Sequence, residues 1–386
     1  MPILDVLRAT VQLRASDLFL KVGGPPRVRV DGNVRQLGTQ AMTKDDVKEA
    51  FHTLVDEHAR AIFQKYHEVD TAFESEGVGR FRINCFMQRG NIGLVLRLVQ
   101  SHIPDYQDLG LPVETFERLA LLRRGLVLVT GITGSGKSTT LASMIQYMNR
   151  NTNRHIITVE DPIEYAYTDE RCLINQREVG IDTRDFKSAL KNAMREAPDV
   201  ILIGEMRDTE TVQAAIDAAE TGHLVLSTLH TINAQQTMER IINFFPPYQH
   251  NLIRMQLSMV VQGVVSQRLV PRANGPGRIP AMEVMIATPT IKQMIEEGRT
   301  PELYAAIRDS QHFGCVTFNQ SLYSLFEQGA ISREDALVTS DNPDEMEMLF
   351  RGIQRGSQSS LQPQQGSAGS AGSAGSAGSS ASNARR

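Results

Sequence analysis

The sequence has few cysteines and no cysteine cluster. Its 386 residues include only three, Cys85, Cys172 and Cys315, and these lie far apart. An odd number at such spacing indicates neither a disulfide framework nor a zinc site. We therefore expect buried, reduced thiols in a protein that works in a reducing compartment and binds no zinc.

Long hydrophobic runs are also missing. No uninterrupted apolar stretch approaches the ~20 residues that a membrane-spanning helix requires. No signal peptide is expected either, because Asp5 falls among the first residues and polar residues recur at helical spacing after it. These absences predict a cytosolic protein whose association with a membrane goes through a partner.

An excess of positive charge is the third feature that the chain lacks. Lysine and arginine number 40, aspartate and glutamate 44, and the formal net charge is −4. This balance argues against a nucleic-acid partner, and so against a helicase or a recombinase. The hydrophobic content of 41% is sufficient for a packed core in each of the two or three domains that the length suggests.

Residues 1–100 mix short helical and strand patterns and are predicted to form an α+β domain. Helices are expected over Pro2–Leu13 and from Thr43, which caps its helix, to about Val55. Strands are expected at Asp17–Val22, Arg27–Val30, Gly79–Met87 and Ile92–Val99. Residues 101–112 follow as a polar linker punctuated by proline.

Residues 113–350 show a different pattern, in which apolar strand-like runs alternate with amphipathic helices. The runs are Gly125–Thr130, His155–Val159, Val200–Ile203 and Leu224–Leu229. Their richness in valine, isoleucine and leucine is typical of strands buried on both faces. The alternation predicts an α/β domain with a parallel sheet and crossover helices. Residues 351–386 are rich in Gln, Ser, Gly and Ala, and are predicted to form a disordered tail because they offer too little apolar surface to bury.

A phosphate-binding loop follows the first apolar run. Gly131 to Ser138 read GITGSGKS, which matches G-x-x-x-x-G-K-[ST]. The context is the required one, because a strand precedes the loop and a helix to about Met148 follows it. The glycines let backbone amides point at phosphate oxygens, and the helix N-terminus adds its positive end.

Each residue of this loop has an expected contact with nucleotide. Lys137 is predicted to reach the β- and γ-phosphates of ATP, and the Ser138 hydroxyl to ligate Mg²⁺. The full set predicted to bind the nucleotide is Gly131, Thr133, Gly134, Ser135, Gly136, Lys137, Ser138 and Thr139.

Hydrolysis also needs a further carboxylate for the metal and a base for the attacking water. Glu160 follows one apolar run directly, and Glu205 follows another after a glycine. Because the carboxyl ends of parallel strands lie beside such a loop, Glu205 is predicted to hold Mg²⁺ through water. Glu160 is predicted to activate the water, with Asp161 in support. The alternative is a structural role, in which these carboxylates cap a helix or pair with Arg207.

Two histidines bracket the last apolar run. His223 precedes it and His230 follows it. Seven residues of extended strand span about 23 Å, so the two histidines cannot ligate one metal ion. His230 is at the carboxyl end, where it is predicted to contact the γ-phosphate or the attacking water. His223 is expected to hold structure or a neighbouring subunit.

Taken together, these motifs resemble those of the type IV pilus retraction ATPases of the PilT and PilU type, within the secretion-ATPase superfamily. The resemblance covers roughly residues 1–350. It rests on GITGSGKS and on ITVEDPIEY (Ile157–Tyr165), NQREVG (Asn175–Gly180), ILIGEMRD (Ile201–Asp208) and TGHLVLSTLHT (Thr221–Thr231), with SDLFL (Ser16–Leu20) and RVDG (Arg29–Gly32) near the start.

The resemblance implies a fold, an assembly and further site residues. It implies a PAS-like α+β N-terminal domain followed by a RecA-like P-loop NTPase domain, a ring-shaped homohexamer, and nucleotide between the two domains. It also implies that arginines of the N-terminal domain reach the γ-phosphate, and the matching positions are Arg82 and Arg97, with Arg80 as a weaker third. Glu160 matches the position of the family's base.

The same resemblance implies a function. Members of this family are cytoplasmic motors at the inner face of the cytoplasmic membrane, where they act on a PilC-like platform protein and power pilus retraction and twitching motility. The chain lacks the four-cysteine zinc element that is usual in pilus-assembly and type II secretion ATPases, which favours retraction over extension.

One departure from the family pattern keeps two other functions open. Where PilT-type motors carry an AIRNL element, the chain has Thr290–Met294, with Lys292 in place of the arginine. Lysine lacks the planar donor fork of arginine, and the extended C-terminal end is more similar to PilU. An accessory nucleotide-binding ring that modulates a PilT-type partner ATPase is therefore an alternative. A DNA-handling RecA-like ATPase is a less favoured one.

Overall fold

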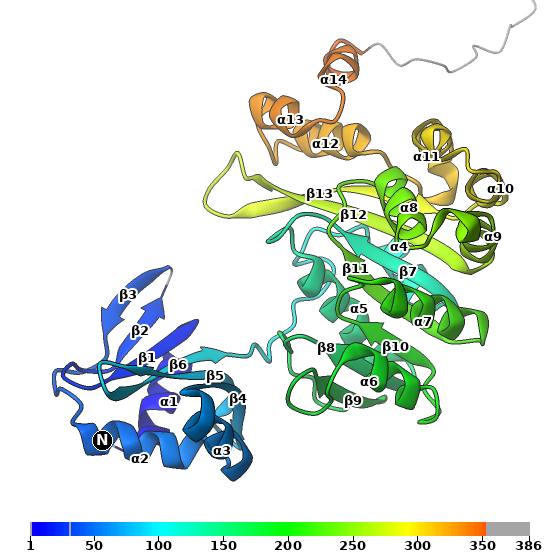
Figure 1. Ribbon diagram of the computed structural model, residues 1–386. Helices are drawn as coiled ribbons and strands as arrows, with labels where there is room; N and C mark the ends of the chain where they lie inside the picture. Colours follow the sequence, from blue (N-terminus) through cyan, green and yellow to red (C-terminus); the bar gives the residue numbers. More distant parts are fainter. Residues whose placement is uncertain (1, 31, 353–386) are drawn as a thin grey trace, which may run out of the picture.

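The computed structural model describes residues 2–30 and 32–352, and their strands form two separate sheets. The first is six-stranded, in the order β3-β2-β1-β6-β5-β4, and the second is seven-stranded, in the order β13-β12-β7-β11-β10-β8-β9. Figure 1 shows an N-terminal lobe around the first sheet and a larger C-terminal lobe around the second. The predicted tail lies, apart from residues 351 and 352, outside the described residues.

The N-terminal lobe is an antiparallel sheet with helices on one face. Its elements are α1 (Ile3–Gln12), β1 (Asp17–Lys21), β2 (Arg27–Val30), β3 (Asn33–Gln36), α2 (Lys44–Leu54), α3 (Glu57–Tyr66), β4 (Glu68–Ser75), β5 (Gly79–Gln88) and β6 (Asn91–Leu98). Alternating side chains explain the single covered face, since Leu18 and Leu20 are buried in the core whereas Lys21 is exposed. The helices pack against that core, and the arginines of β5 and β6 lie on the other face.

The predicted elements of this lobe are present, but the prediction was incomplete. Thr43 caps α2 in a capping box with Asp46, as its position before the helix indicated. The helix α3 and the strands β3 and β4 were missed, because their sequences are polar and their periodicity is weak. The strand β4 can be identified only from its pairing with β5 in the structure.

The C-terminal lobe is a mostly parallel sheet between two layers of helices. Its elements begin with α4 (Val113–Ala120), β7 (Gly125–Thr130), α5 (Lys137–Asn151), β8 (His155–Glu160), β9 (Leu173–Glu178), α6 (Phe186–Ala193), β10 (Val200–Ile203), α7 (Thr209–Glu220), β11 (Leu224–Leu229), α8 (Ala234–Asn243) and α9 (His250–Val260). Helices α4 and α5 cover one face, and α6 to α9 cover the other. The strands β7 and β11 are buried along their whole length, as their apolar composition predicted.

The order of the strands separates two parts of the predicted site. The strand β11 lies between β7, which leads into the phosphate-binding loop, and β10, which leads to Glu205. His230, at the end of β11, is therefore on the strand next to the loop, and Glu205 is one strand further away. The sequence analysis predicted His230 and Glu205 at the correct edge of the sheet, but it did not predict the strand order β7-β11-β10.

The segment predicted as a linker, residues 101–112, has exposed polar residues and buried apolar ones. Ile103, Tyr106 and Leu111 are buried, and Tyr106 packs against Phe116 of α4. Tyr106 and Leu111 belong to the core of the C-terminal lobe and anchor the segment on it.

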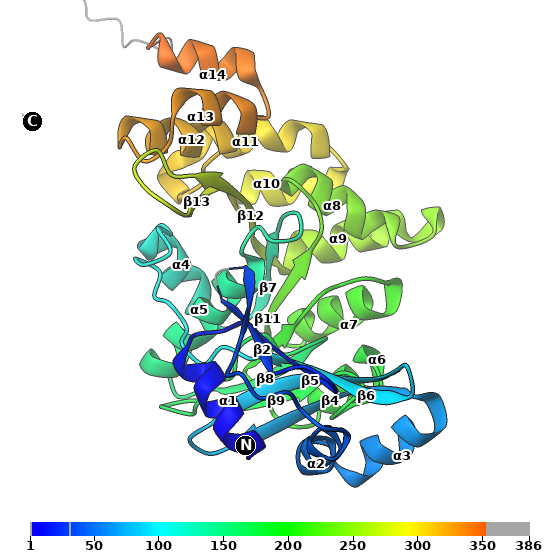
Figure 2. The same cartoon turned by 90° about the vertical axis from the view of Figure 1, so that its left-hand side faces the viewer.

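The remaining elements extend the sheet and cover its far end. They are β12 (Val261–Pro271), β13 (Arg278–Ile286), α10 (Pro289–Glu297), α11 (Leu303–Asp309), α12 (Phe318–Glu327), α13 (Arg333–Thr339) and α14 (Pro343–Phe350), with short 3-10 turns at Pro247–Gln249, Thr300–Glu302 and Gln311–Phe313. Figures 1 and 2 both place α12 to α14 at the opposite end of the molecule from the N-terminal lobe. Among the described residues, no helix is both long and apolar enough to cross a bilayer.

Candidate functional site

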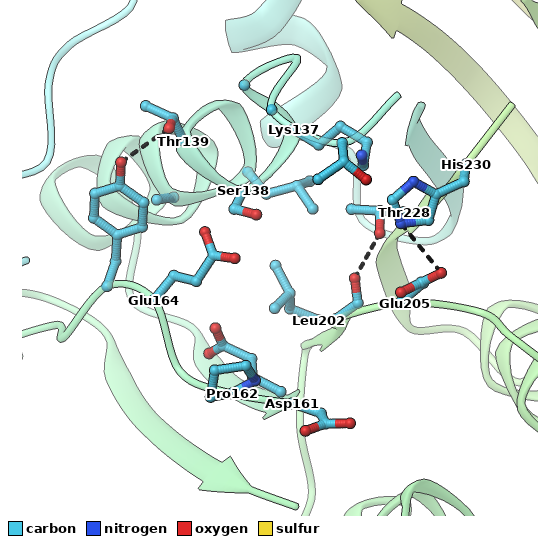
Figure 3. Close-up of a pocket in the computed structure, with 18 of the residues that line it drawn as sticks. Lys137, Ser138, Thr139, Asp161, Pro162, Glu164, Leu202, Glu205, Thr228 and His230 are labelled. Atoms are coloured by element: carbon cyan, nitrogen blue, oxygen red, sulfur yellow. Dashed lines mark hydrogen bonds and ion pairs between the residues drawn. The ribbon is translucent and has the colours of Figure 1, made fainter. Parts of the chain in front are cut away.

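A cavity of about 640 Å³ lies at the carboxyl ends of the parallel strands. One of its walls is the phosphate-binding loop with the start of α5, and the other is formed by the residues that follow β8, β10 and β11. Figure 3 shows Lys137 and Ser138 on one side, with Glu164, Asp161 and Glu205 across the cavity. Of the predicted site residues, those that line it are Thr133, Gly134, Gly136, Lys137, Ser138, Thr139, Glu160, Glu205 and His230, and Asp161 lines it with them.

The loop wall depends on backbone conformations that favour glycine. Gly134 and Gly136 have φ of 78° and 93°, values at which an L-residue is strained. At Gly131 space is limiting as well, since a Cβ there would lie 2.4 Å from the Ser135 Oγ and 2.6 Å from the Gln267 carbonyl oxygen. Gly131 and Ser135 thus support the loop from behind the cavity wall.

Lys137 is held by the loop that precedes it. Its Nζ donates to the carbonyl oxygens of Gly131 and Ile132, at 2.9 and 3.1 Å. Burial lowers the pKa of Lys137, and the carboxylates of Glu205 and Glu164 counteract that effect. The ammonium group is thus fixed at the mouth of a loop whose glycines permit the backbone to turn its amides toward a phosphate.

The loop wall fits a bound phosphate group through its backbone. Gly134 and Gly136 have positive φ, and Gly136 directly precedes the first residue of α5. A glycine-rich turn at a helix N-terminus points backbone amides at an anion. Ser135 is 2% exposed and does not line the cavity.

Glu160 is the last residue of β8 and is surrounded by hydrogen-bond donors. The Thr158 Oγ1 donates to its Oε1 at 2.7 Å, and the Gln176 Nε2 donates to the same oxygen at 3.3 Å. Burial raises the pKa of Glu160 to about 7, and these two hydrogen bonds oppose the increase. A carboxyl group with a pKa near neutrality can accept a proton during a reaction at physiological pH.

Glu205 makes the ion pair that the structural alternative anticipated. Its Oε2 accepts from the Arg207 Nε at 2.8 Å, and its Oε1 lies 3.4 Å from the Nε2 of His230. The same Arg207 reaches Asp161, with a distance of 3.3 Å to its Oδ2. Arg207 therefore bridges the ends of β8 and β10, and Glu205 is 20% exposed toward the cavity.

Glu164 and Tyr165 are among the cavity residues that were not singled out from the sequence. Glu164 adds a further carboxylate opposite Ser138 (Figure 3). The Tyr165 hydroxyl forms a hydrogen bond of 2.9 Å with the Thr139 Oγ1, which ties the loop after β8 to α5. Both residues belong to the ITVEDPIEY segment, so the motif was recognised but only its first carboxylates were interpreted.

The arginines of the N-terminal lobe are not in the cavity. Among the described residues that line it, neither Arg82 nor Arg97 is found. The Nη2 of Arg82 lies 3.8 Å from the Oδ1 of Asp70, and the Nε of Arg97 lies 2.9 Å from the Oδ1 of Asp17. The two arginines are neighbours because β5 and β6 pair at these residues. The structure therefore does not bring them to the phosphate-binding loop of the same chain.

Arg80 makes a contact between the lobes instead. Its Nη2 lies 3.2 Å from the Oε2 of Glu178 on β9, and its Nη1 lies 3.2 Å from Glu74 of its own lobe. Glu178 is 4% exposed and is the strand partner of Glu160. Arg80, the weaker third candidate for contact with the γ-phosphate, thus links the N-terminal sheet to β9, the strand beside Glu160.

The other predicted residues are placed as their positions indicated. His223 is at the far end of β11, where its Nδ1 lies 2.9 Å from the Ala218 carbonyl oxygen, a structural contact. The three cysteines are buried and unpaired, as expected. Burial raises the pKa of the Cys85 thiol to about 12, so it is unreactive at neutral pH.

A strand, a glycine-rich loop and a helix that begins at Lys137, with carboxylates at neighbouring strand ends, define a P-loop nucleotide-binding protein of the RecA-like class. The chain belongs to the Type II/IV secretion system protein family, whose model matches residues 27–336. It is 44% identical over 354 residues to the type IV pilus ATPase PilU of Pseudomonas aeruginosa, with 92% of each chain covered. It is 43% identical over 344 residues to the pilus retraction ATPase PilT of the same organism, covering 89% of this chain and 99% of that protein.

Solved structures show the same fold. The crystal structure of the pilus retraction motor PilT with bound ADP is 45% identical, with a TM-score of 0.82, and the match covers 90% of this chain and 99% of that one. The ATPase DotB of Legionella pneumophila is 26% identical, with a TM-score of 0.73 and coverage of 91% and 96%. The expected fold class is confirmed, and the family is one of nucleotide-binding ATPases.

Proposed function

We propose that this chain hydrolyses ATP to ADP and phosphate, and that it uses the reaction to power retraction of type IV pili and thus twitching motility. The observation that carries the proposal is the cavity in which Lys137 and Ser138 face Glu160, Glu164 and Glu205. The relatives described as pilus ATPases PilU and PilT are matched over almost their whole length, which supports the same role for the whole chain.

The loop wall would bind the triphosphate. Backbone amides of Gly134 to Ser138 and the Lys137 ammonium would hold the β- and γ-phosphates. Ser138 and Glu205, the latter through water, would hold Mg²⁺. The ion is a hard cation that takes oxygen ligands and keeps several waters, which fits a hydroxyl, a partly exposed carboxylate and the phosphates themselves. When bound, Mg²⁺ neutralises negative charge on the β- and γ-phosphate oxygens.

Glu160 would act on the attacking water. Its carboxylate accepts a proton from the water as the water oxygen bonds to the γ-phosphorus, and the bond from that phosphorus to the β–γ bridging oxygen breaks. ADP and phosphate result, and the proton leaves Glu160 afterwards. His230 is next to Glu205 and opens on the same cavity, where it would contact the γ-phosphate or the water.

Arg82 and Arg97 would reach the phosphates only after the lobes move. They lie on the helix-free face of the N-terminal sheet together with Arg80, which already contacts the strand beside Glu160. Closure of this lobe over the cavity would add positive charge where it develops in phosphoryl transfer. The motion would couple hydrolysis to mechanical work.

We further propose the assembly in which this motion would act. A homohexameric ring at the inner face of the cytoplasmic membrane would turn a PilC-like platform protein, to which the ring is attached from the cytoplasm. The similarity to the pilus retraction motor PilT along nearly the whole chain supports a role in the pilus machine, on which this assembly depends.

A second candidate is an accessory ring that modulates a PilT-type partner ATPase. The identities to PilU and PilT are nearly equal, and Lys292 stands on α10 where PilT-type motors carry arginine. The rate of ATP hydrolysis by the purified protein distinguishes the two. A motor hydrolyses ATP much faster than its Lys137→Ala variant, whereas a purely regulatory ring does not.

Deletion of the gene in its source organism tests the proposed function in the cell. We expect an excess of surface pili and loss of twitching, both restored by the wild-type gene and not by Lys137→Ala. Absence of pili in the deletion strain would contradict retraction and indicate a role in assembly.

A further inference from the structure

Gln176 lies beside the proposed base but has no role in the chemistry described so far. It is on β9, which pairs in parallel with β8 so that Gln176 is opposite Thr158, and Glu178 is opposite Glu160. Residues two apart on a strand share a face. These four side chains therefore form two neighbouring rows on one face of the sheet edge.

The amide of Gln176 is held in one orientation. Its Oε1 accepts a hydrogen bond from the Tyr167 backbone amide at 2.9 Å, and its Nε2 donates to the Tyr165 carbonyl oxygen at 2.9 Å. Rotation of the amide by half a turn would oppose an N–H to an N–H and an oxygen to an oxygen. The loop after β8 thus fixes which side of Gln176 faces Glu160.

The fixed amide and a neighbouring hydroxyl engage the same carboxylate oxygen. The second N–H of the Gln176 Nε2 reaches the Glu160 Oε1 at 3.3 Å, and the Thr158 Oγ1 donates to this oxygen at 2.7 Å. Thr158 is fully buried. Among the described residues, no side chain donates to the Oε2 of Glu160, and the further donor to this carboxylate is the backbone amide of Glu164.

We propose that Gln176, together with Thr158, is a positioning residue for ATP hydrolysis: the two side chains hold the Oε1 of Glu160 so that its Oε2 is presented to the attacking water. The inference rests on the proposed function, in which Glu160 is the base. Gln176 acts through Glu160 and contacts neither the nucleotide nor the water.

The same hydrogen bonds lower the pKa of Glu160 against the larger effect of its burial. Burial raises its pKa to about 7, and the donors Thr158 and Gln176 lower it by stabilising the carboxylate. The titratable groups that face it are Glu164 and Tyr167 from the loop after β8, and Glu178 from β9, which is paired with Arg80 of the N-terminal lobe. Loss of either donor must therefore raise the pKa of Glu160 further.

The test is the pH profile of kcat/KM for ATP in the full-length protein. In Gln176→Met, which keeps the side-chain length and removes the amide, we expect the acid limb to move upward by about one pH unit, the size expected when a carboxylate loses one donor. Asn175→Leu is the matched control, because Asn175 is the adjacent amide on the opposite face of β9 and contacts His155. Its profile should remain that of the wild type.

A second pair of variants keeps the test decisive if Gln176→Met does not fold. Thr158→Val removes the other donor and should shift the acid limb in the same direction, whereas Thr158→Ser retains the hydroxyl and should restore the wild-type limb. A uniform decrease of kcat/KM with an unmoved limb in Gln176→Met or Thr158→Val would overturn the inference. Glu160→Gln in the same assay distinguishes failure of the proposed function from failure of this inference. Full activity of Glu160→Gln would refute Glu160 as the base, whatever the role of Gln176.

Discussion

The two walls of the nucleotide cavity are built in different ways. The loop wall consists of consecutive residues, Gly131 to Ser138, whose lysine is held by carbonyl oxygens of the same loop. The carboxylate wall is assembled from the ends of β8, β10 and β11, and its side chains contact partners from their own segment and from a neighbouring strand. Glu160 accepts hydrogen bonds from Thr158 of β8 and Gln176 of β9, and Glu205 contacts Arg207 of its own loop and His230 at the end of β11.

This difference separates binding from hydrolysis. A self-contained loop can bind phosphates whatever the state of the rest of the molecule. A wall made of side chains from several strands can respond to the position of the N-terminal lobe, because Arg80 of that lobe contacts Glu178 of β9, the strand next to Glu160. We therefore expect the loop wall to control affinity, and the carboxylate wall to control the rate and its dependence on domain position.

The largest effect is expected for the loop wall. Lys137→Ala removes the charge held at the mouth of the loop, and hydrolysis should decrease by about 10²–10³-fold or more, the loss typical of one preorganised donor. Because this wall also binds, the affinity for ATP should decrease with it, as measured by equilibrium binding. Lys187→Ala is a suitable control, since Lys187 pairs with Glu210 at the surface. Unchanged ATP affinity in Lys137→Ala would remove the distinction between the walls.

The pH dependence of kcat/KM in the wild-type protein should report the protonation of Glu160 in the carboxylate wall. Because burial raises the pKa of Glu160 from 4.5 to about 7, the base is protonated and inactive below that pH. We expect kcat/KM to decrease about tenfold per pH unit below pH 7, and to be constant above it. ATP binding by Glu160→Gln, measured over the same range, should show no such decrease. An acid limb near pH 4.5, the pKa of an unperturbed glutamate, would contradict a base whose pKa is raised by burial.

The ion pair between Arg80 and Glu178, which joins the two lobes, should make a smaller but measurable contribution to the free energy of unfolding. The side chain of Arg80 is 19% exposed and that of Glu178 5%. Their coupling in a double-mutant cycle of Arg80→Gln and Glu178→Gln should therefore be about 1–2 kcal/mol of unfolding free energy. The parallel cycle with Glu74, the exposed partner of the same arginine, should give less than about 0.5 kcal/mol. Equal couplings in the two cycles would mean that Arg80 does not tether the lobes preferentially through Glu178.

The smallest effect is expected at Glu205. Arg207 donates to one oxygen of this carboxylate and would compete there with Mg²⁺. Arg207→Met should therefore lower the Mg²⁺ concentration that gives half-maximal hydrolysis by about two- to fivefold, which corresponds to an exposed ion pair. A titration of the ATPase rate with Mg²⁺ measures this. An increase in the required concentration would show that Arg207 supports the metal site rather than opposing it.

The same contrast explains how far the sequence could be interpreted. Each residue type in the loop has a local reason, so Gly131, Lys137 and Ser138 could be assigned from their spacing alone. The buried strands β7 and β11 were also predicted, because fully apolar runs are unusual outside such sheets. The strand order was not, since nothing local specifies that β11 lies between β7 and β10.

The residues that sequence reasoning missed are those whose partners are distant in the chain. Gln176 becomes informative only when β9 pairs with β8, and Glu164 only when its loop folds back toward α5. Arg207 was considered as a partner of the carboxylates, but the way it bridges Glu205 and Asp161 needed the structure. Arg82 and Arg97 were assigned by resemblance, and because neither lines the cavity, their proposed role requires the N-terminal lobe to move.

The most direct test of the account is a paired measurement on Glu160→Gln, of ATP affinity by equilibrium binding and of hydrolysis in a single turnover with Mg²⁺. We predict an affinity close to that of the wild type and a rate lower by about 10²–10⁴-fold, the range for loss of a general base. Hydrolysis at the wild-type rate, or loss of ATP binding together with hydrolysis, would contradict the separation of the two walls.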